Sequence, residues 1–324
     1  MKPFFSLPER KVGGGFSRCA RRPVAVMMLM AMAMAAWLPA AQADTIVVKD
    51  DAGNTLTLAA PARRIVSLAP HITETLYAAG AGGLIVGAVE YSDYPAAAKA
   101  LLRVGGYSRF DLERIVALKP DLVIGWLSGN PAAQIEQLRG LGLPLFMVQP
   151  SRIDDIAGTL ERFGLLAGTS RIAQPLAEQL RGRLQGLRSR YSGKPVVRTF
   201  YQIWRQPLTT VGGSQVISDV IRLCGGENVF ARLVPLAPTV SVEAVIAANP
   251  EAIIVSGQGE SRQERDSDWK QWNSVTAVQR GNIFYIHPDL MQRHTPRLVD
   301  AATQLCEQLE VSRSRRPAAG HETK

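Results

Sequence analysis

Hydrophobic and polar positions along this chain follow one pattern twice, at an offset of 130 residues (241 minus 111). Segments 111–124 and 241–254 each begin with a short amphipathic stretch and end with an unbroken apolar run, which is typical of a buried strand. Pro120 and Pro250 separate the two parts, because proline cannot continue a helix. We therefore predict a helix, a proline and a strand in each segment.

A second pair of similar segments lies upstream of each of these. An apolar strand at 64–68 precedes an amphipathic helix at 72–80, and a strand at 196–201 precedes a helix at 217–225. A hydroxyl and an acid lie in the first turn of each helix, and glycine ends it. Because strands and helices alternate, the pattern predicts an α/β fold with two similar lobes, each a parallel sheet flanked by helices.

One long rigid helix is predicted to join the two lobes. Segment 170–190 is rich in Ala, Leu, Gln, Arg and Glu, and Gly193-Lys194-Pro195 ends it. Gly182 and Gly186 weaken this helix by about 1 kcal/mol each relative to alanine. Such a connector allows less hinge motion than flexible strands would. Two lobes joined in this way leave a cleft between them, and such a cleft is the usual place for a ligand. The predicted parts are an N-terminal lobe at 44–168, a connecting helix at 169–193, a C-terminal lobe at 194–311 and a disordered tail at 312–324.

Residues 1–43 have the pattern of a secretory signal peptide. Basic residues come first, the apolar run 23–40 follows, and Ala41-Gln42-Ala43 supplies the small residues that signal peptidase recognises. We predict cleavage after Ala43 and a periplasmic protein. A retained membrane anchor is the alternative, since roughly 17 to 25 apolar residues span a bilayer, but the Ala-Gln-Ala exit favours removal.

Removal of this segment changes the charge and the cysteine count. The segment carries six basic residues and one acid, so the formal charge falls from +9 to +4. No basic stripe with interleaved aromatic residues remains, which argues against nucleic acid as a partner. Cys224 and Cys306 are the cysteines that remain. In an oxidising compartment they are expected to form one disulfide, with two buried free thiols as the alternative.

Motifs for catalysis and for metal binding are weak. The glycines at 212–213 and 225–226 lack both the ending of a phosphate-binding loop and the spacing of a dinucleotide site. No nucleophile elbow of the Gly-x-Ser-x-Gly type is present. His71, His287 and His294 lack a short-range partner ligand for zinc or manganese. We predict a protein that is not an enzyme, with no catalytic residues, no metal site and no cofactor.

Several motifs together resemble the solute-binding proteins of ABC importers for cobalamin, ferric siderophores and haem. The resemblance extends over residues 46–310. Within this family, the chain most resembles the cobalamin-binding branch, because it shares the Tyr-Ser-Asp-Tyr-Pro motif, the Cys-Gly-Gly-Glu-Asn motif and the late Cys306. The motifs are Ile65-Val66-Ser67-Leu68-Ala69-Pro70 with Thr73-Glu74, Tyr91-Ser92-Asp93-Tyr94-Pro95, the block 112–124, and Leu223-Cys224-Gly225-Gly226-Glu227-Asn228-Val229-Phe230.

The resemblance implies a monomeric periplasmic receptor that captures cobalamin or a related corrinoid in the cleft between its lobes. Its implied partners are the two-fold permease of an ABC importer and the ATPase of that importer. Haem or a ferric siderophore is the alternative ligand. For haem, His71 is a candidate axial ligand, whereas Arg109 and Arg205 suit an anionic chelate. A sensor that signals to another membrane protein is a third possibility, and an enzyme is the least favoured class.

The resemblance also implies site residues. Glu113 and Glu243 match the permease-docking glutamates, although each is also an ordinary first-turn acid that the helix dipole favours. Ala237 departs from the cobalamin receptors, which carry a tryptophan there, so that position leaves the ligand open. For Asp289 and Arg293, the alternative to a ligand contact is a local ion pair. For the aromatic residues, the alternative is packing in the core. The implied ligand contacts are Tyr91, Tyr107, Trp126, Asp289 and Arg293, and Trp204 follows a strand that brings it to the same cleft.

Overall fold

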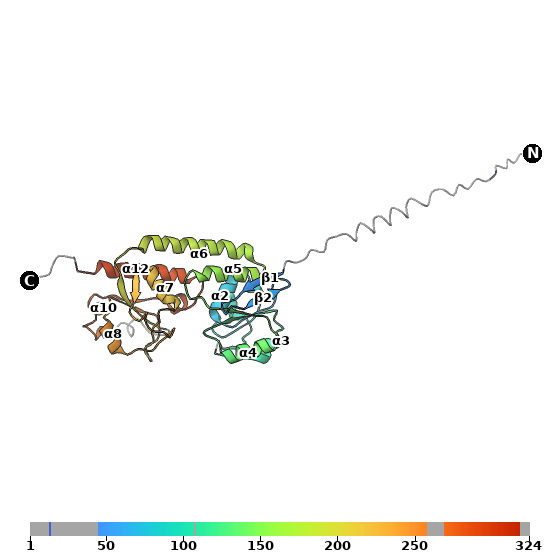
Figure 1. Cartoon of the computed structure of the whole chain (residues 1–324), viewed down its shortest axis with the longest axis horizontal. Coiled ribbons are helices and arrows are strands. Elements are labelled where there is room, and N and C mark those ends of the chain that lie inside the picture. Colours follow the sequence, from blue (N-terminus) through green and yellow to red (C-terminus); the bar gives the residue numbers. More distant parts are fainter. Residues whose placement is uncertain (1–12, 14–44, 107, 258–268, 318–324) are drawn as a thin grey trace, which may run out of the picture. The chain divides into compact units, whose positions relative to one another are not determined.

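The computed structural model describes residues 13, 45–106, 108–257 and 269–317 (Figure 1). The predicted signal peptide and its cleavage site lie outside this described part, apart from Gly13. Within it, no helix is both long enough and apolar enough to cross a bilayer.

The N-terminal lobe is built on a four-stranded parallel sheet with the strand order β4-β3-β7-β8. A small antiparallel hairpin of β1 and β2 precedes it. Strand β7 is buried at nearly every position, which explains its unbroken apolar sequence. The elements are β1 (Ile46–Lys49), β2 (Thr55–Leu58), β3 (Ile65–Ser67), α2 (Pro70–Ala78), η1 (Gly82–Leu84), β4 (Ile85–Ala88), η2 (Ala96–Ala100), β5 (Gly105–Gly106), β6 (Arg109–Phe110), α3 (Leu112–Ala117), β7 (Leu122–Trp126), α4 (Ala132–Gly140), β8 (Leu145–Val148) and α5 (Asp155–Ala167).

The C-terminal lobe repeats this plan. Its four parallel strands have the order β10-β9-β11-β12, so each of them has a counterpart at the same place in the first sheet. Strand β11 is buried throughout, as its counterpart β7 nearly is. The predicted α/β fold with two similar lobes is confirmed. The elements are β9 (Val197–Gln202), α7 (Val216–Leu223), β10 (Gly226–Asn228), α8 (Val242–Ala248), β11 (Ala252–Val255), α10 (Thr276–Gln279), β12 (Ile283–Tyr285), α11 (Pro288–Met291) and α12 (Leu298–Ser314).

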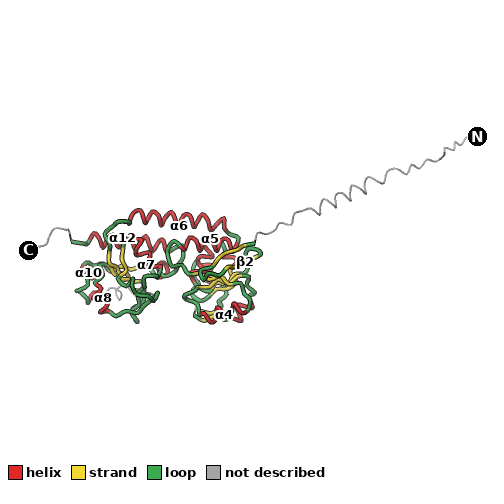
Figure 2. Tube along the Cα trace, in the orientation of Figure 1, coloured by secondary structure: helices red, strands yellow, loops and turns green. Residues whose placement is uncertain are grey.

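A single helix, α6 (Ser170–Tyr191), connects the lobes and runs alongside α5 and α12 (Figures 1 and 2). Its buried residues form one stripe along the helix, as expected for a helix that packs on one side. Gly182 and Gly186 have open space around them, so they lie on the solvent side of the helix. The stripe consists of Ala173, Ala177, Leu180, Leu184 and Tyr191.

Both lobes share one hydrophobic core. It runs from the face of the first sheet covered by α2 and α5, through α6, to the face of the second sheet covered by α7 and α12. The opposite face of each sheet has a core of its own, under α3 and α4 in the first lobe and under α8 and α10 in the second. Sliding one lobe past the other would expose shared apolar surface at a cost of about 25 cal/mol per Å². The continuous core therefore restrains motion between the lobes.

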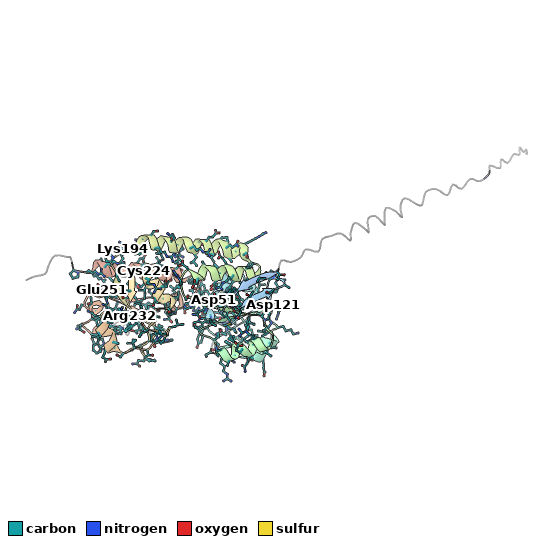
Figure 3. The ribbon with its side chains drawn as sticks, viewed as in Figure 1. Asp51, Asp121, Lys194, Cys224, Arg232 and Glu251 are labelled. Atoms are coloured by element: carbon teal, nitrogen blue, oxygen red, sulfur yellow. A yellow bond between two sulfur atoms is a disulfide. The ribbon has the colours of Figure 1, made fainter. Side chains whose placement is uncertain are left out.

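The disulfide prediction is confirmed, since Cys224 and Cys306 are joined. Cys224, labelled in Figure 3, is the C-cap of α7, and Cys306 lies in α12. Both residues are fully buried. The bond therefore links the two helices that cover the inner face of the second sheet.

The predicted start of the tail at residue 312 is wrong, because α12 continues to Ser314. Arginine side chains attach this end of the chain to the second lobe. Arg313 donates hydrogen bonds to the carbonyl oxygens of Cys224, at 2.8 Å, and Gly225, at 3.0 Å. Arg316 donates to the carboxylate of Glu251, a residue labelled in Figure 3, at 2.8 Å. The basic residues by themselves indicated a solvated tail. The sequence did not show that carbonyl and carboxylate groups from distant segments would accept hydrogen bonds from these arginines.

Candidate functional site

The carboxyl ends of the parallel strands carry the predicted ligand residues. Trp126 is the last residue of β7, Tyr91 follows β4, and Trp204 follows β9. Asp289 and Arg293 come after β12, in and just beyond α11. In open α/β sheets, ligands bind outside this edge. The fold thus places these five side chains at the edge that parallel sheets use for binding, whereas Tyr107 lies outside the described residues.

A cavity of about 260 Å³ lies at this edge and is lined by residues of both lobes. Apolar side chains form more than half of its lining, and most of its polar groups are neutral amides and hydroxyls. Trp126 and Ala237, the position at which the resemblance implies a tryptophan, both line it. The lining residues are Trp126, Ser128, Gln149, Pro150, Ile203, Ser214, Gln215, Val216, Ile217, Leu236, Ala237, Gln292 and His294.

Three rings meet where the lobes contact each other beside this cavity. The ring centroids of His71 and Trp126 are 5.2 Å apart, those of His71 and His294 are 5.6 Å apart, and those of Trp126 and His294 are 6.3 Å apart. Burial lowers the pKa of His294 to about 4 and that of His71 well below its ordinary value. Both imidazoles are therefore neutral near pH 7. The sequence identified His71 as a candidate axial ligand for haem, but no local pattern indicated that the ring of His294 would contact it.

A network of ion pairs joins the lobes next to these rings. Arg297 donates two hydrogen bonds of 2.6 Å to Glu74, whose side chain is 3% exposed. The guanidinium of Arg297 also lies 3.6 Å from the ring centroid of Tyr94. These contacts were not predicted. Forked pairs of this kind fix orientation as well as distance, so the network holds α2 of one lobe against the start of α12 of the other.

Arg293 belongs to the same network. It donates to Asp93 of the first lobe at 2.8 Å and pairs with Asp289 at 3.1 Å. Partial burial acts to raise the pKa of Asp93, but the hydrogen bond from Arg293 and its positive charge outweigh this effect and lower the pKa. The local ion pair between Asp289 and Arg293, an alternative considered from the sequence, is therefore present. Arg293 in addition reaches across the cleft to the other lobe.

Two of the predicted aromatic residues are exposed. Tyr91 is 69% exposed and Trp204 is 51% exposed. Tyr91 has a φ of 62°, in the left-handed region that a bulky residue adopts only when its surroundings enforce it. A large aromatic ring held in the solvent at the carboxyl edge of a sheet is available for a ligand. Neither ring packs in the core, which was the alternative considered for both.

The glycines at 212–213 have a structural role. A Cβ atom on Gly212 would lie 2.2 Å from the carbonyl oxygen of Pro235, and one on Gly213 would lie 2.1 Å from that of Ala231. The amide of Gly212 donates to the Leu236 carbonyl at 3.1 Å. The segment that carries Leu236 and Ala237 can therefore close against this turn only because the turn lacks side chains.

Glu113 and Glu243 occupy equivalent positions. Each is the second residue of its helix, and both side chains are exposed. Asp111 and Ser241 cap these helices by accepting hydrogen bonds from the amides of Arg114 and Ala244, at 3.0 and 3.2 Å. Hydrogen bonds from its own backbone amide and from Ser241 lower the pKa of Glu243. Each glutamate lies on the helix that covers the sheet face away from the shared core.

A family model described as periplasmic binding protein matches residues 65–290. The chain belongs to the periplasmic binding protein family. The prediction of a binding protein rather than an enzyme is thereby confirmed.

The relatives of this binding protein include the vitamin B12-binding protein of Vibrio parahaemolyticus, 38% identical over 81% of this chain and 95% of the relative. The vitamin B12-binding protein of Yersinia pestis is 40% identical over 78% of this chain and 89% of the relative. Among solved structures, the periplasmic vitamin B12-binding protein BtuF of Vibrio cholerae is 37% identical with a TM-score of 0.73, covering 78% of this chain and 98% of that one. The haem-binding protein RhuT from Roseiflexus is 27% identical with a TM-score of 0.67, covering 78% and 99%.

Acid should destabilise this binding protein through His294. The unfolded imidazole takes up a proton near pH 6.5, whereas the folded one does so only near 4. The unfolded state therefore binds more protons in this window, so stability is complete above about pH 6.5 and falls toward pH 4. We expect His294 alone to remove about 2.5 kcal/mol between about pH 7 and about pH 4.5. His294→Phe should reduce the loss measured by urea denaturation at the two pH values. An unchanged pH dependence in the variant would contradict this expectation.

Proposed function

We propose that this periplasmic binding protein captures cobalamin or a related corrinoid between its lobes and delivers it to the permease of an ABC importer. The observation that carries the proposal is the chemistry of the cavity, where a tryptophan and apolar residues alternate with neutral amides. A corrin is a broad ring whose edge carries carboxamide groups, so it needs both kinds of contact. The identities of 37–40% to proteins named as vitamin B12-binding give independent support.

The proposed ligand contacts are those expected from the sequence. Tyr91 and Trp204 present exposed rings, Trp126 forms part of the cavity wall, and Tyr107 is retained from the resemblance. Asp289 and Arg293 serve the amides of the ligand. A guanidinium has five N–H donors, so Arg293 keeps its bonds to Asp93 and Asp289 and still donates to the ligand.

Haem is less well supported. An axial ligand must offer an accessible nitrogen or oxygen to the iron, and the candidate His71 is 6% exposed with its ring against Trp126. The likeness to a haem-binding protein at 27% identity keeps haem as the competing ligand to be tested.

For delivery, we propose that Glu113 and Glu243 bind arginine residues of the permease. Two carboxylates at equivalent places on two similar lobes suit a partner with two-fold symmetry, and arginine binds a carboxylate through a forked pair. The same proposal includes export by the signal peptide, cleavage after Ala43, and an ATPase that drives the permease.

Calorimetric titration of the purified protein with cyanocobalamin, haemin and a ferric hydroxamate tests the ligand. We expect one-to-one binding of cyanocobalamin and no binding of the iron compounds. Binding of haemin or of the ferric chelate in place of the corrinoid would contradict the proposal and leave the receptor architecture unchanged.

A further inference from the structure

The two helices that carry Glu113 and Glu243 are short and have little buried surface. Helix α3 has six residues and α8 has seven. Both helices lie within the described part of the chain, and each buries one residue completely, Ile115 in α3 and Val245 in α8. Helices of this length are not stable alone, and in proteins they depend on contacts with the rest of the fold. Contacts outside the core are therefore needed to hold the two glutamates in place.

An arginine at the beginning of an inner strand holds the carboxyl end of each helix. In the first lobe, Arg64 directly precedes β3 and donates to the carbonyl oxygen of Leu118, the C-cap of α3, at 2.6 and 3.0 Å. In the second lobe, Arg198 of β9 donates to the carbonyl oxygen of Ala248, the last residue of α8, at 2.6 Å. A cation at this end of a helix also complements the helix dipole. Each contact ties a helix end to its sheet.

An acidic residue binds the backbone of each arginine. Asp121 accepts a hydrogen bond from the amide of Arg64 at 2.8 Å, and its own amide donates to the Arg64 carbonyl oxygen at 3.0 Å. Glu251 accepts from the amide of Arg198 at 3.4 Å and donates to its carbonyl oxygen at 2.7 Å. Both acids are labelled in Figure 3. Each arginine is therefore fixed opposite the strand that follows the helix it holds.

The arrangement is equivalent in the two lobes. The carbonyl groups that accept the arginine bonds belong to Leu118 and Ala248, which differ by the offset of the repeat, 130 (248 minus 118). The next residues, Lys119 and Asn249, both have left-handed backbones, with φ of 46° and 40°. Residues other than glycine keep this conformation only where their surroundings enforce it. Both helix ends are therefore held in one defined geometry, and the arginines are part of what holds them.

We propose that Arg64 and Arg198 are positioning residues for permease docking, which fix the spacing and orientation of Glu113 and Glu243 by holding their helices. The inference rests on the proposed docking role of the two glutamates. Each glutamate lies five residues before the carbonyl group that the arginine holds (118 minus 113, and 248 minus 243). Two contacts with one partner reinforce each other only when their spacing fits that partner. Loosening of either helix therefore weakens docking although both carboxylates remain.

The test measures binding of the protein to the purified permease–ATPase complex of its importer in lipid nanodiscs, by surface plasmon resonance. Arg64→Met and Arg198→Met retain a long side chain and remove its donors. We expect each variant to bind the complex about five-fold more weakly, because part of the gain from the second contact is lost. Arg64→Lys, which keeps the charge and can still donate, should recover part of the loss.

A double-mutant cycle separates positioning from a general structural role. In a chain that already carries Glu113→Ala, Arg64→Met should cause no further weakening, because the carboxylate that it positions is absent. Arg198→Met should likewise have no further effect in a chain that carries Glu243→Ala. A general loosening of the fold would instead weaken docking equally with and without the glutamates.

Arg181→Met is the matched control, because Arg181 is an exposed arginine of α6 that pairs with Glu161 of α5. It should leave docking unchanged. Neither Arg64 nor Arg198 lines the cavity, so their variants should bind cyanocobalamin within about two-fold of the unchanged protein. Variants in two lobes, each checked by thermal unfolding, keep the test decisive if one of them fails to fold.

Two results would overturn the positioning role. One is that the arginine variants dock as well as the unchanged protein, and the other is that they weaken docking equally in chains with and without the glutamates. If Glu113→Ala with Glu243→Ala leaves binding to the permease–ATPase complex unchanged, the proposed docking role itself fails. That result is distinguishable, because it appears before any arginine is changed.

Discussion

Replacement of Glu113 and Glu243 together by alanine is expected to abolish ligand uptake by cells while ligand affinity stays unchanged. Both carboxylates are exposed at the beginnings of α3 and α8. These helices cover the sheet faces away from the shared core, and neither glutamate lines the cavity. Loss of both would remove the two charged contacts that we propose for the permease, and the second contact of a pair acts at high effective concentration. Each single variant should therefore reduce uptake only partly.

Uptake of labelled cyanocobalamin by cells that lack their own binding protein measures this effect. Calorimetry on the same variants measures affinity. Glu178→Ala is a matched control, because Glu178 is an exposed glutamate on α6, a helix of the shared core. If the glutamates were only first-turn acids, the variants would lose about 0.3 to 1 kcal/mol of helix stabilisation each and uptake would continue. Normal uptake by the double variant would therefore refute the docking role.

Removal of the disulfide by Cys224→Ser with Cys306→Ser should lower the free energy of unfolding by about 4 kcal/mol. The bond joins residues separated by 82 positions, so it restricts a long loop in the unfolded chain. It also links α7 to α12 inside the second lobe, where both cysteines are fully buried. The hydroxyl groups of the two serines would be buried there as well, which adds to the loss.

Urea denaturation of the oxidised protein and of the double serine variant measures this difference. The unchanged protein with its disulfide reduced serves as the control that separates cross-linking from the buried hydroxyl groups. Reduced protein and variant should both unfold at lower urea than the oxidised protein. A difference below about 1 kcal/mol between the oxidised and reduced forms would show that the unfolded chain gains little freedom when the bond is absent.

Much of the fold could be predicted because its signals are local. One such signal is the helix before Pro120 followed by the apolar run of β7, and the same signal recurs around Pro250. Each depends only on residues that are close together in the sequence. Burial on both faces makes a central parallel strand continuously apolar, so the strand is visible without its partners. The same holds for α6, whose buried stripe follows the helical period.

The walls of the cavity were only partly predictable. Trp126 was implied as a ligand contact by the resemblance, and its place at the end of an apolar strand favoured the cleft over the core, because parallel strands end at one edge of a sheet. The contacts of Trp126 with His71 and His294 had no local signal, because each histidine is isolated in its own segment. Glycines 212–213 carried a signal that the sequence left unexplained, since the segment they accommodate is supplied by a later part of the chain.

The amino-acid sequence by itself determined the two similar lobes, the helix between them and the family, because periodicity, proline positions and motifs act over short distances. The disulfide could be predicted because two cysteines follow the predicted signal peptide and an oxidising compartment favours their pairing. Only the tertiary structure decided which distant groups meet. The pair of Glu74 and Arg297, the crossing of Arg293 to Asp93 and the buried rings at the cavity each join one lobe to the other. Such contacts depend on where the shared core places the two sheets, and a shared core is a property of the packed chain rather than of any segment.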